Sequence, residues 1–146
     1  MSTDPASPVA TDLVDVCAGL SPGQPLHAVR HARAKVVAAT QASHDGLLSP
    51  VVPGISVAER LAVALLACRL SQADALAAHY RQALLGQGGE APAWLAAIEA
   101  DRSLAALPAR LRTILGFTAK LIERPLDGDR AAVQALVQAG LSTPAI

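Results

Sequence analysis

The chain has 146 residues, a length typical of one domain, and 52% of them are hydrophobic, which excludes an intrinsically disordered protein. Its 12 basic and 12 acidic residues give a net charge of zero, and no basic run would neutralise a row of phosphates, so we expect no nucleic-acid partner. The longest apolar run, residues 61–68, is far short of the ~20 residues that span a bilayer, so we expect no membrane partner. Alanine and leucine dominate while aromatic residues are scarce, which predicts an all-α fold.

The first ten residues differ in composition from the rest. Residues 1–10 are rich in serine, proline and aspartate, and we expect a flexible arm there. They contain neither the basic stretch nor the apolar stretch of a secretory signal, so a cytoplasmic location is the default expectation. Residues 11–146 are expected to form a single helical domain.

Two helices are predicted before the first long loop. Thr11 is suited to cap a short helix that ends before Gly19, with an apolar face that includes Cys17. Pro25 suits the first position of a second helix, which we expect to run to about Ala42. Two glycines and two prolines then predict a loop over residues 46–54.

A helical hairpin is predicted in the middle of the chain. Ser56 and Glu59 have the spacing of a capping box, which predicts a helix from there to about Leu70. The segment 71–74 (SQAD) repeats this spacing with a shorter acid, so we expect a tight turn and a second helix that ends at about Leu85.

The C-terminal part of the chain predicts three more helices. Pro92 can open a short one, Pro108 can open one to about Glu123, and Asp129 can cap a last one. Apolar periodicity predicts which side chains of the two later helices face inward: Leu111, Leu115, Thr118, Ala119, Ile122, Val133, Leu136 and Val137. Ser142 and Pro144 have the pattern of one further helix start, so the domain is expected to end where another helix begins.

His79 and Tyr80, next to each other on the second helix of the hairpin, are the first candidate site. An imidazole in an apolar cleft could transfer protons near neutral pH, assisted by the carboxylate of Glu59 on the preceding helix. The alternative is that His79 is a hydrogen-bonded packing residue, that Tyr80 fills volume and that Glu59 only caps its helix. Both interpretations remain open from the sequence.

Other residues of catalytic or ligating type give weaker signals. His27 and His31 are spaced i, i+4, so both could face one metal ion with His44 or Asp45 as a third ligand, although a solvated helix face is favoured. The cysteines, Cys17 and Cys68, form no C-x-x-C pair and are expected to be buried thiols. Nothing in the sequence indicates a bound metal or cofactor.

The hairpin segment SVAERLAVALLACRLSQADALAAHYRQAL resembles the central part of the carboxymuconolactone decarboxylase family, which includes the AhpD-like alkylhydroperoxidases. The later segment RLRTILGFTAKLIERPLDGDRAAVQALVQAGLSTPAI is similar to the C-terminal part of that family. The two together cover roughly residues 56–146. The resemblance implies an AhpD-like helical bundle of six or seven helices, assembled as a homo-oligomer.

The resemblance also implies where the chemistry of the peroxidase members would lie. Their helix carries C-x-x-C-x-x-x-H, and aligning its histidine with His79 places the two thiol positions at Gln72 and Ala75. Neither side chain can attack a peroxide, because that step needs a sulfur. We therefore expect a family member without peroxidatic thiols that binds a small apolar molecule near His79. The alternatives are a non-catalytic helical interaction module and, with less support, an antioxidant enzyme that uses Cys68.

Overall fold

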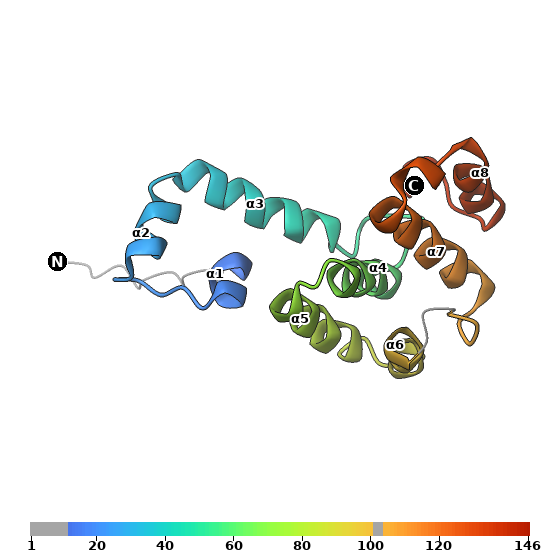
Figure 1. The fold of residues 1–146 in the computed structure, drawn as a ribbon, viewed down its shortest axis with the longest axis horizontal. Coiled ribbons are helices and arrows are strands. Elements are labelled where there is room, and N and C mark those ends of the chain that lie inside the picture. The colour runs from blue at the N-terminus through green and yellow to red at the C-terminus, as the bar shows by residue number, and fades with distance from the viewer. Residues whose placement is uncertain (1–11, 101–103) are drawn as a thin grey trace. The chain divides into compact units, whose positions relative to one another are not determined.

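The computed structural model describes residues 12–100 and 104–146, and all regular structure within them is helical (Figure 1). This confirms the all-α prediction. The predicted flexible arm lies outside the described residues. The described residues contain eight α-helices and one short 3-10 helix: α1 (Leu13–Ala18), α2 (Pro25–His31), α3 (Ala34–Leu47), α4 (Val57–Leu70), α5 (Asp74–Leu85), α6 (Ala91–Ala100), α7 (Ala109–Glu123), η1 (Pro125–Asp127) and α8 (Arg130–Gln138).

The chain divides into two compact units, which we call unit 1 (Met1–Gly46) and unit 2 (Leu47–Ile146). Unit 1 contains α1, α2 and nearly all of α3, and none of its described residues, 12–46, is buried. Unit 2 contains α4 to α8 and all of the buried side chains in the described parts of the chain. Among the described residues, a buried hydrophobic core is therefore found in unit 2 alone.

The start and end of α1 follow local rules. The side chain of Asp12 accepts a hydrogen bond from the backbone N–H of Asp15 at 3.0 Å, so Asp12 caps this helix and not the predicted Thr11. Gly19 ends the helix as predicted, with a φ of 63° in the left-handed region, where its N–H reaches the carbonyls of the last turn.

The single helix predicted to start at Pro25 is in fact two helices, α2 and α3. The N–H of Ala32 still bonds the carbonyl of Ala28 at 2.9 Å, whereas the N–H of Arg33 bonds that of Arg30 at 3.3 Å, one residue too close for an α-helix. This tightening ends α2 at His31, and α3 begins at Ala34. α3 then continues through Gly46, beyond the predicted end at Ala42.

The hairpin of unit 2 forms where the sequence predicts it. In the capping box of α4, Ser56 Oγ accepts from the N–H of Glu59 at 3.1 Å, and Glu59 Oε2 accepts from the N–H of Ser56 at 2.8 Å. The second predicted capping box is wrong, because the cap of α5 is Ala73 and no side chain bonds there. Gln72, with a φ of 57°, makes the turn instead.

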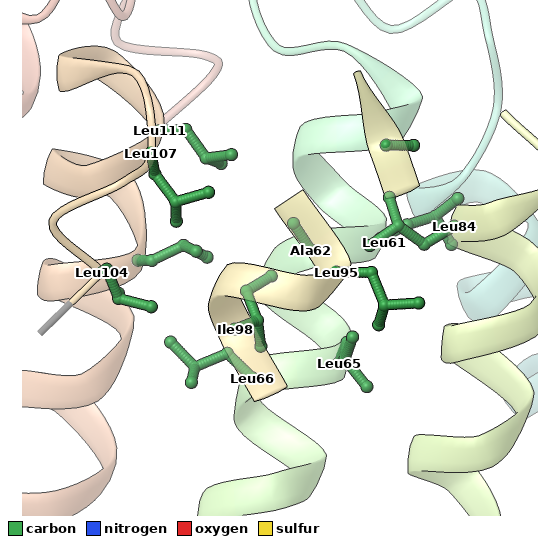
Figure 2. Close-up of a cluster of buried hydrophobic side chains, with 12 residues drawn as sticks. Leu61, Ala62, Leu65, Leu66, Leu84, Leu95, Ile98, Leu104, Leu107 and Leu111 are labelled. Atoms are coloured by element: carbon green, nitrogen blue, oxygen red, sulfur yellow. The ribbon is translucent and has the colours of Figure 1, made fainter. Parts of the chain in front are cut away.

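The main core lies around α4, which packs against α5, α6 and α7. In Figure 2, the α4 side chains of Leu61, Leu65 and Leu66 lie among leucine and isoleucine side chains of the neighbouring helices. Alanine and leucine on α4 make it apolar on most of its surface, which suits a helix with neighbours on several sides. The full buried cluster is Leu61, Ala62, Leu65, Leu66, Leu84, Ala91, Leu95, Ile98, Leu104, Leu107, Leu111 and Leu115.

A smaller buried cluster joins α7, α8 and the segment that follows them. It consists of Ile114, Leu136 and Leu141. The predicted inward set for these helices is therefore wrong in part. Ile122 is exposed, and so are Val133 and Val137, whereas Ala132 and Leu136 are the buried residues of α8.

The segment after α8 folds back on the loop before α4. The N–H groups of Ala145 and Ile146 bond the carbonyl of Ser142 at 2.9 and 3.1 Å, as in the first turn of a helix. Gly54 lies directly against this turn: a Cβ placed on it would be 3.0 Å from Ser142 Oγ. The close approach and the φ of 86° at Gly54 both require glycine.

Candidate functional site

Glu59 is one of the predicted site residues. Among the described residues it is the one charged residue that is buried, with 8% of its surface exposed. Oε2 of its carboxylate accepts the hydrogen bond of the capping box, and Oε1 accepts one from Nε of Arg110 at 2.7 Å. Arg110 lies in the first turn of α7 and donates further to the carbonyls of Gly54 and Ala139 at 2.6 and 3.1 Å. The carboxylate therefore ties the start of α4 to α7 and, through Arg110, to the end of α8.

The charge on Glu59 is maintained by these partners. Burial raises the pKa of its carboxyl group, but the hydrogen bonds from Arg110 and Ser56 and the charge of Arg110 outweigh burial and hold the pKa below its usual value. Glu59 is consequently ionised at neutral pH. A general base is more effective when its pKa lies near the working pH, so this environment suits a structural ion pair better than proton transfer.

His79 and Tyr80 make an edge-to-face pair on α5. Their ring centroids are 5.2 Å apart and their planes meet at 75°, a favourable arrangement for two aromatic rings. Both side chains are partly buried, and Tyr80 packs against the main core. The pair therefore combines packing with partial access to solvent.

The described residues also form an open cleft of about 440 Å³ at the end of the hairpin. It lies between the end of α4, the start of α5 and the end of α6, and is lined by Leu66, Arg69, Leu70, Asp74, Ile98, Glu99 and Ala100. Glu59, His79 and Tyr80 are not among these residues. The three predicted site residues are thus not brought together around this cleft.

Gln72 and Ala75, which the family resemblance aligns with the peroxidase thiols, have no side chain suited to thiol chemistry. Gln72 is in the turn before α5, and Ala75 is exposed in the first turn of that helix. Of the two cysteines, Cys68 is buried on α4 with 8% exposed, and partial burial raises the pKa of the Cys17 thiol. A raised pKa and a buried sulfur both reduce the reactive thiolate at neutral pH.

Asp15, His27 and His31 lie together in the structure, whereas the sequence predicts only the pairing of the two histidines. His27 and His31 do face the same way on α2, and their rings stack with centroids 4.0 Å apart and planes at 16°. The third group beside them is Asp15 of α1, and not His44 or Asp45 as predicted. Oδ2 of Asp15 is 2.7 Å from Nε2 of His31 and 3.8 Å from Nε2 of His27. His44 and Asp45 instead pair with each other, with 3.0 Å between Nδ1 and Oδ1.

Comparison with known proteins adds no assignment to these residues: no family model, no curated protein and no solved structure matches the chain. The family resemblance therefore remains a prediction from the residues quoted above. The described helices include none that combines the length and the apolar character needed to cross a membrane.

Proposed function

We propose that this chain is a carboxymuconolactone decarboxylase-like helical protein without peroxidatic thiols, and that it acts as an assembly module in which unit 1 pairs with unit 1 of a second copy. The helical hairpin of α4 and α5 supports the family part of the proposal, because the resemblance rests mainly on this segment. The side chains at Gln72 and Ala75 support a role without thiol chemistry.

The observation that carries the assembly part is that none of residues 12–46 is buried. Short helices gain most of their stability by burying an apolar face, and units of roughly 40 residues usually need oligomerisation, a metal ion or disulfides. Large apolar side chains of unit 1 are nevertheless on its surface: Val14, Val16, Leu26, Val29 and Val36. Packing against another chain would bury them.

α2 has the two faces that such pairing requires. His27 and His31 lie on the face that meets Asp15 of α1. Leu26 and Val29 are three residues apart on the opposite face, where they are 62% and 69% exposed. An apolar stripe of this kind on a surface helix indicates a contact with another helix.

A second copy is the partner we propose, because the charges of unit 1 do not oppose self-association. In residues 12–46 three basic side chains balance three acidic ones: Arg30, Arg33 and Lys35 against Asp12, Asp15 and Asp45. A two-fold pair would bring the same apolar stripe together from both chains, which is the commonest symmetry of soluble oligomers.

Light scattering on a sizing column, over a hundredfold range of protein concentration, tests the assembly. The wild-type chain is expected to associate, and the double variant Leu26→Glu, Val29→Glu is expected to be monomeric. Ala28→Glu is the control, since it places a glutamate on another, exposed position of α2. A monomeric wild-type chain at all concentrations, or dissociation by Ala28→Glu as well, would contradict the proposal.

A second candidate function is binding of a small apolar molecule near His79. The partly buried edge-to-face pair with Tyr80 favours it, because such a pair offers an aromatic surface beside a proton-transferring group. Titration with a small γ-lactone, followed by the NMR signals of the imidazole, should shift the ring of His79 and leave that of His44 unchanged. Equal shifts of both rings would indicate non-specific contact and contradict this function.

An antioxidant role for Cys68 has the least support, because the sulfur is buried. Peroxide consumption by the wild-type chain is expected to equal that of Cys68→Ser. A turnover that disappears in Cys68→Ser would restore this role.

A further inference from the structure

We propose that Asp15, His27 and His31 form a Zn²⁺ site that joins α1 to α2. The three side chains each offer one ligand atom, and these atoms lie within 4.8 Å of one another. Ligand atoms around a tetrahedral zinc ion are about 3.4 Å apart, since each is about 2.0–2.1 Å from the metal. Rotation of the side chains could therefore bring the three atoms to the distances that an ion requires.

The helical spacing places both imidazoles beside Asp15. His27 and His31 are one turn apart on α2, and the nearly parallel stacking of their rings keeps both Nε2 atoms on the side of Asp15. Both nitrogens approach the same oxygen, Oδ2, at 3.8 and 2.7 Å. Because an ion must lie in the plane of each ligating ring, one of the stacked rings has to turn about its Cβ–Cγ bond before both Nε2 lone pairs meet at one ion.

Arg30 positions the carboxylate for this role. Its Nη1 donates to Oδ1 of Asp15 at 2.8 Å, which leaves Oδ2 directed towards the imidazoles. Its Nη2 pairs with Asp12 at 2.9 Å, so a second carboxylate offsets the positive charge of the guanidinium beside the site. Nη1 also lies 3.3 Å from Nε2 of His31, the nitrogen that would ligate zinc, so the ion would have to displace this contact. Metal ligands commonly have such outer partners, which fix their orientation.

The ligand types favour a transition metal over the hard cations. Two imidazoles and one carboxylate suit Zn²⁺, whereas Mg²⁺ and Ca²⁺ prefer oxygen ligands alone. Zinc would take the lone pair of each Nε2, so the proton of each neutral ring would be on Nδ1, and any proton held on Nε2 would go to solvent. Three protein ligands leave the fourth position of a tetrahedral ion to water.

The site would supply what unit 1 lacks. In the described part of that unit no side chain is buried, and a metal ion that cross-links two helices stabilises the folded state without a core. Zinc should therefore raise the thermal midpoint of unit 1 and increase its helicity. This effect is separate from the assembly proposed above, which uses the opposite face of α2.

Calorimetric titration of the full-length, chelator-treated chain with ZnCl₂ tests the site. We expect one Zn²⁺ per chain, and an affinity reduced by roughly tenfold or more in each of Asp15→Asn, His27→Gln and His31→Gln. His44→Gln is the matched control, a histidine of the same unit outside the cluster, and should bind like the wild-type chain. MgCl₂ should give no binding. One ion per two chains, or an equal loss in His44→Gln, would overturn the proposal.

X-ray absorption at the zinc edge gives a test that does not depend on how the ligand variants fold. In the wild-type chain the first shell should contain nitrogen and oxygen and no sulfur, with the outer-shell scattering of two imidazoles. The double variant Cys17→Ser, Cys68→Ser should give the same spectrum. A sulfur ligand, or a spectrum of fewer than two imidazoles, would show that zinc binds elsewhere and overturn the proposal.

Discussion

Oε1 of Glu59 accepts a 2.7 Å hydrogen bond from Nε of Arg110, a residue 51 positions later in the chain. Glu59 also closes the capping box of α4, so one buried carboxylate fixes both the start of that helix and its packing against α7. This arrangement makes Glu59 a stabilising residue of unit 2. Its contribution can be measured separately from any role in binding.

Glu59→Gln should lower the free energy of unfolding by about 1–3 kcal/mol, because an amide of the same shape carries no charge and has one acceptor oxygen, whereas the carboxylate accepts bonds on two. Urea denaturation followed by circular dichroism measures the change. The loss should appear as a lower midpoint with an unchanged slope, as expected for a variant that folds to the same structure.

Glu99→Gln is the control for that variant. Glu99 also pairs with an arginine, Arg81, at 2.8 Å, but both side chains are substantially exposed, 32% and 41%. Exposed pairs contribute less than about 1 kcal/mol, so this variant should be close to wild type. Equal losses in the two variants would show that burial does not strengthen the pair of Glu59 and Arg110.

The pH dependence of stability should also report on Glu59. Burial raises the pKa of its carboxyl group, yet the bonds from Arg110 and Ser56 outweigh burial and lower that pKa in the fold, so the unfolded chain binds the proton more readily. The stabilisation is complete above about pH 4.3, the usual value of a glutamate, and is lost as the pH falls through the lower pKa of the folded state. As the pH falls below about 4.3, the wild-type chain should lose more stability than Glu59→Gln. Parallel pH profiles would contradict this assignment.

Local signals in the sequence predicted much of the fold. The capping box at Ser56 and the cap at Asp129 marked the starts of α4 and α8, because each depends on residues within one helical turn. The break between α2 and α3 was not predictable in this way, since neither proline nor glycine occurs at Ala32 or Arg33. It depends on a local tightening of backbone bonds that has no residue signature.

In the candidate sites, too, the local arrangement was predictable from the sequence and the contacts between helices were not. The i, i+4 spacing of His27 and His31 predicted that their rings face the same way, which they do. Their third partner was not predictable, because Asp15 is on a different helix and meets them through tertiary packing. Spacing along one helix cannot show which residue of another helix lies beside it, and the contact between Glu59 and Arg110 was missed for this reason.

α8 offers a direct test of which face of a helix is buried. Leu136 is 3% exposed against Ile114, while the adjacent Val137 is 46% exposed. Leu136→Ala should cost about 2–5 kcal/mol through the cavity it leaves, and Val137→Ala should change stability by less than about 1 kcal/mol. Thermal unfolding of both variants measures the difference. Similar losses would mean that α8 is rotated relative to the structure described above.

Two glycines of unit 2 should respond in opposite directions to substitution by alanine. Gly116 is inside α7, and a Cβ placed there meets no atom within 4 Å, so Gly116→Ala should stabilise the protein by about 0.5–1 kcal/mol by reducing the freedom of the unfolded chain. Gly54 has a φ of 86°, and a Cβ there would be 3.0 Å from Ser142 Oγ.

Gly54→Ala should therefore destabilise the protein by about 1–3 kcal/mol, the usual cost of a strained backbone position, with further cost from the contact. Chemical denaturation of both variants beside the wild-type chain measures the stabilisation by one and the destabilisation by the other in one experiment. A neutral Gly54→Ala would mean that the loop before α4 does not pack on the turn at Ser142. A further variant, Ser142→Ala, removes the nearest atom while leaving the φ of Gly54 unchanged. Whatever part of the loss it relieves in Gly54→Ala is due to the contact with Ser142 Oγ, and the remainder is due to the backbone conformation and to Ala145 Cβ, 3.1 Å from the added Cβ.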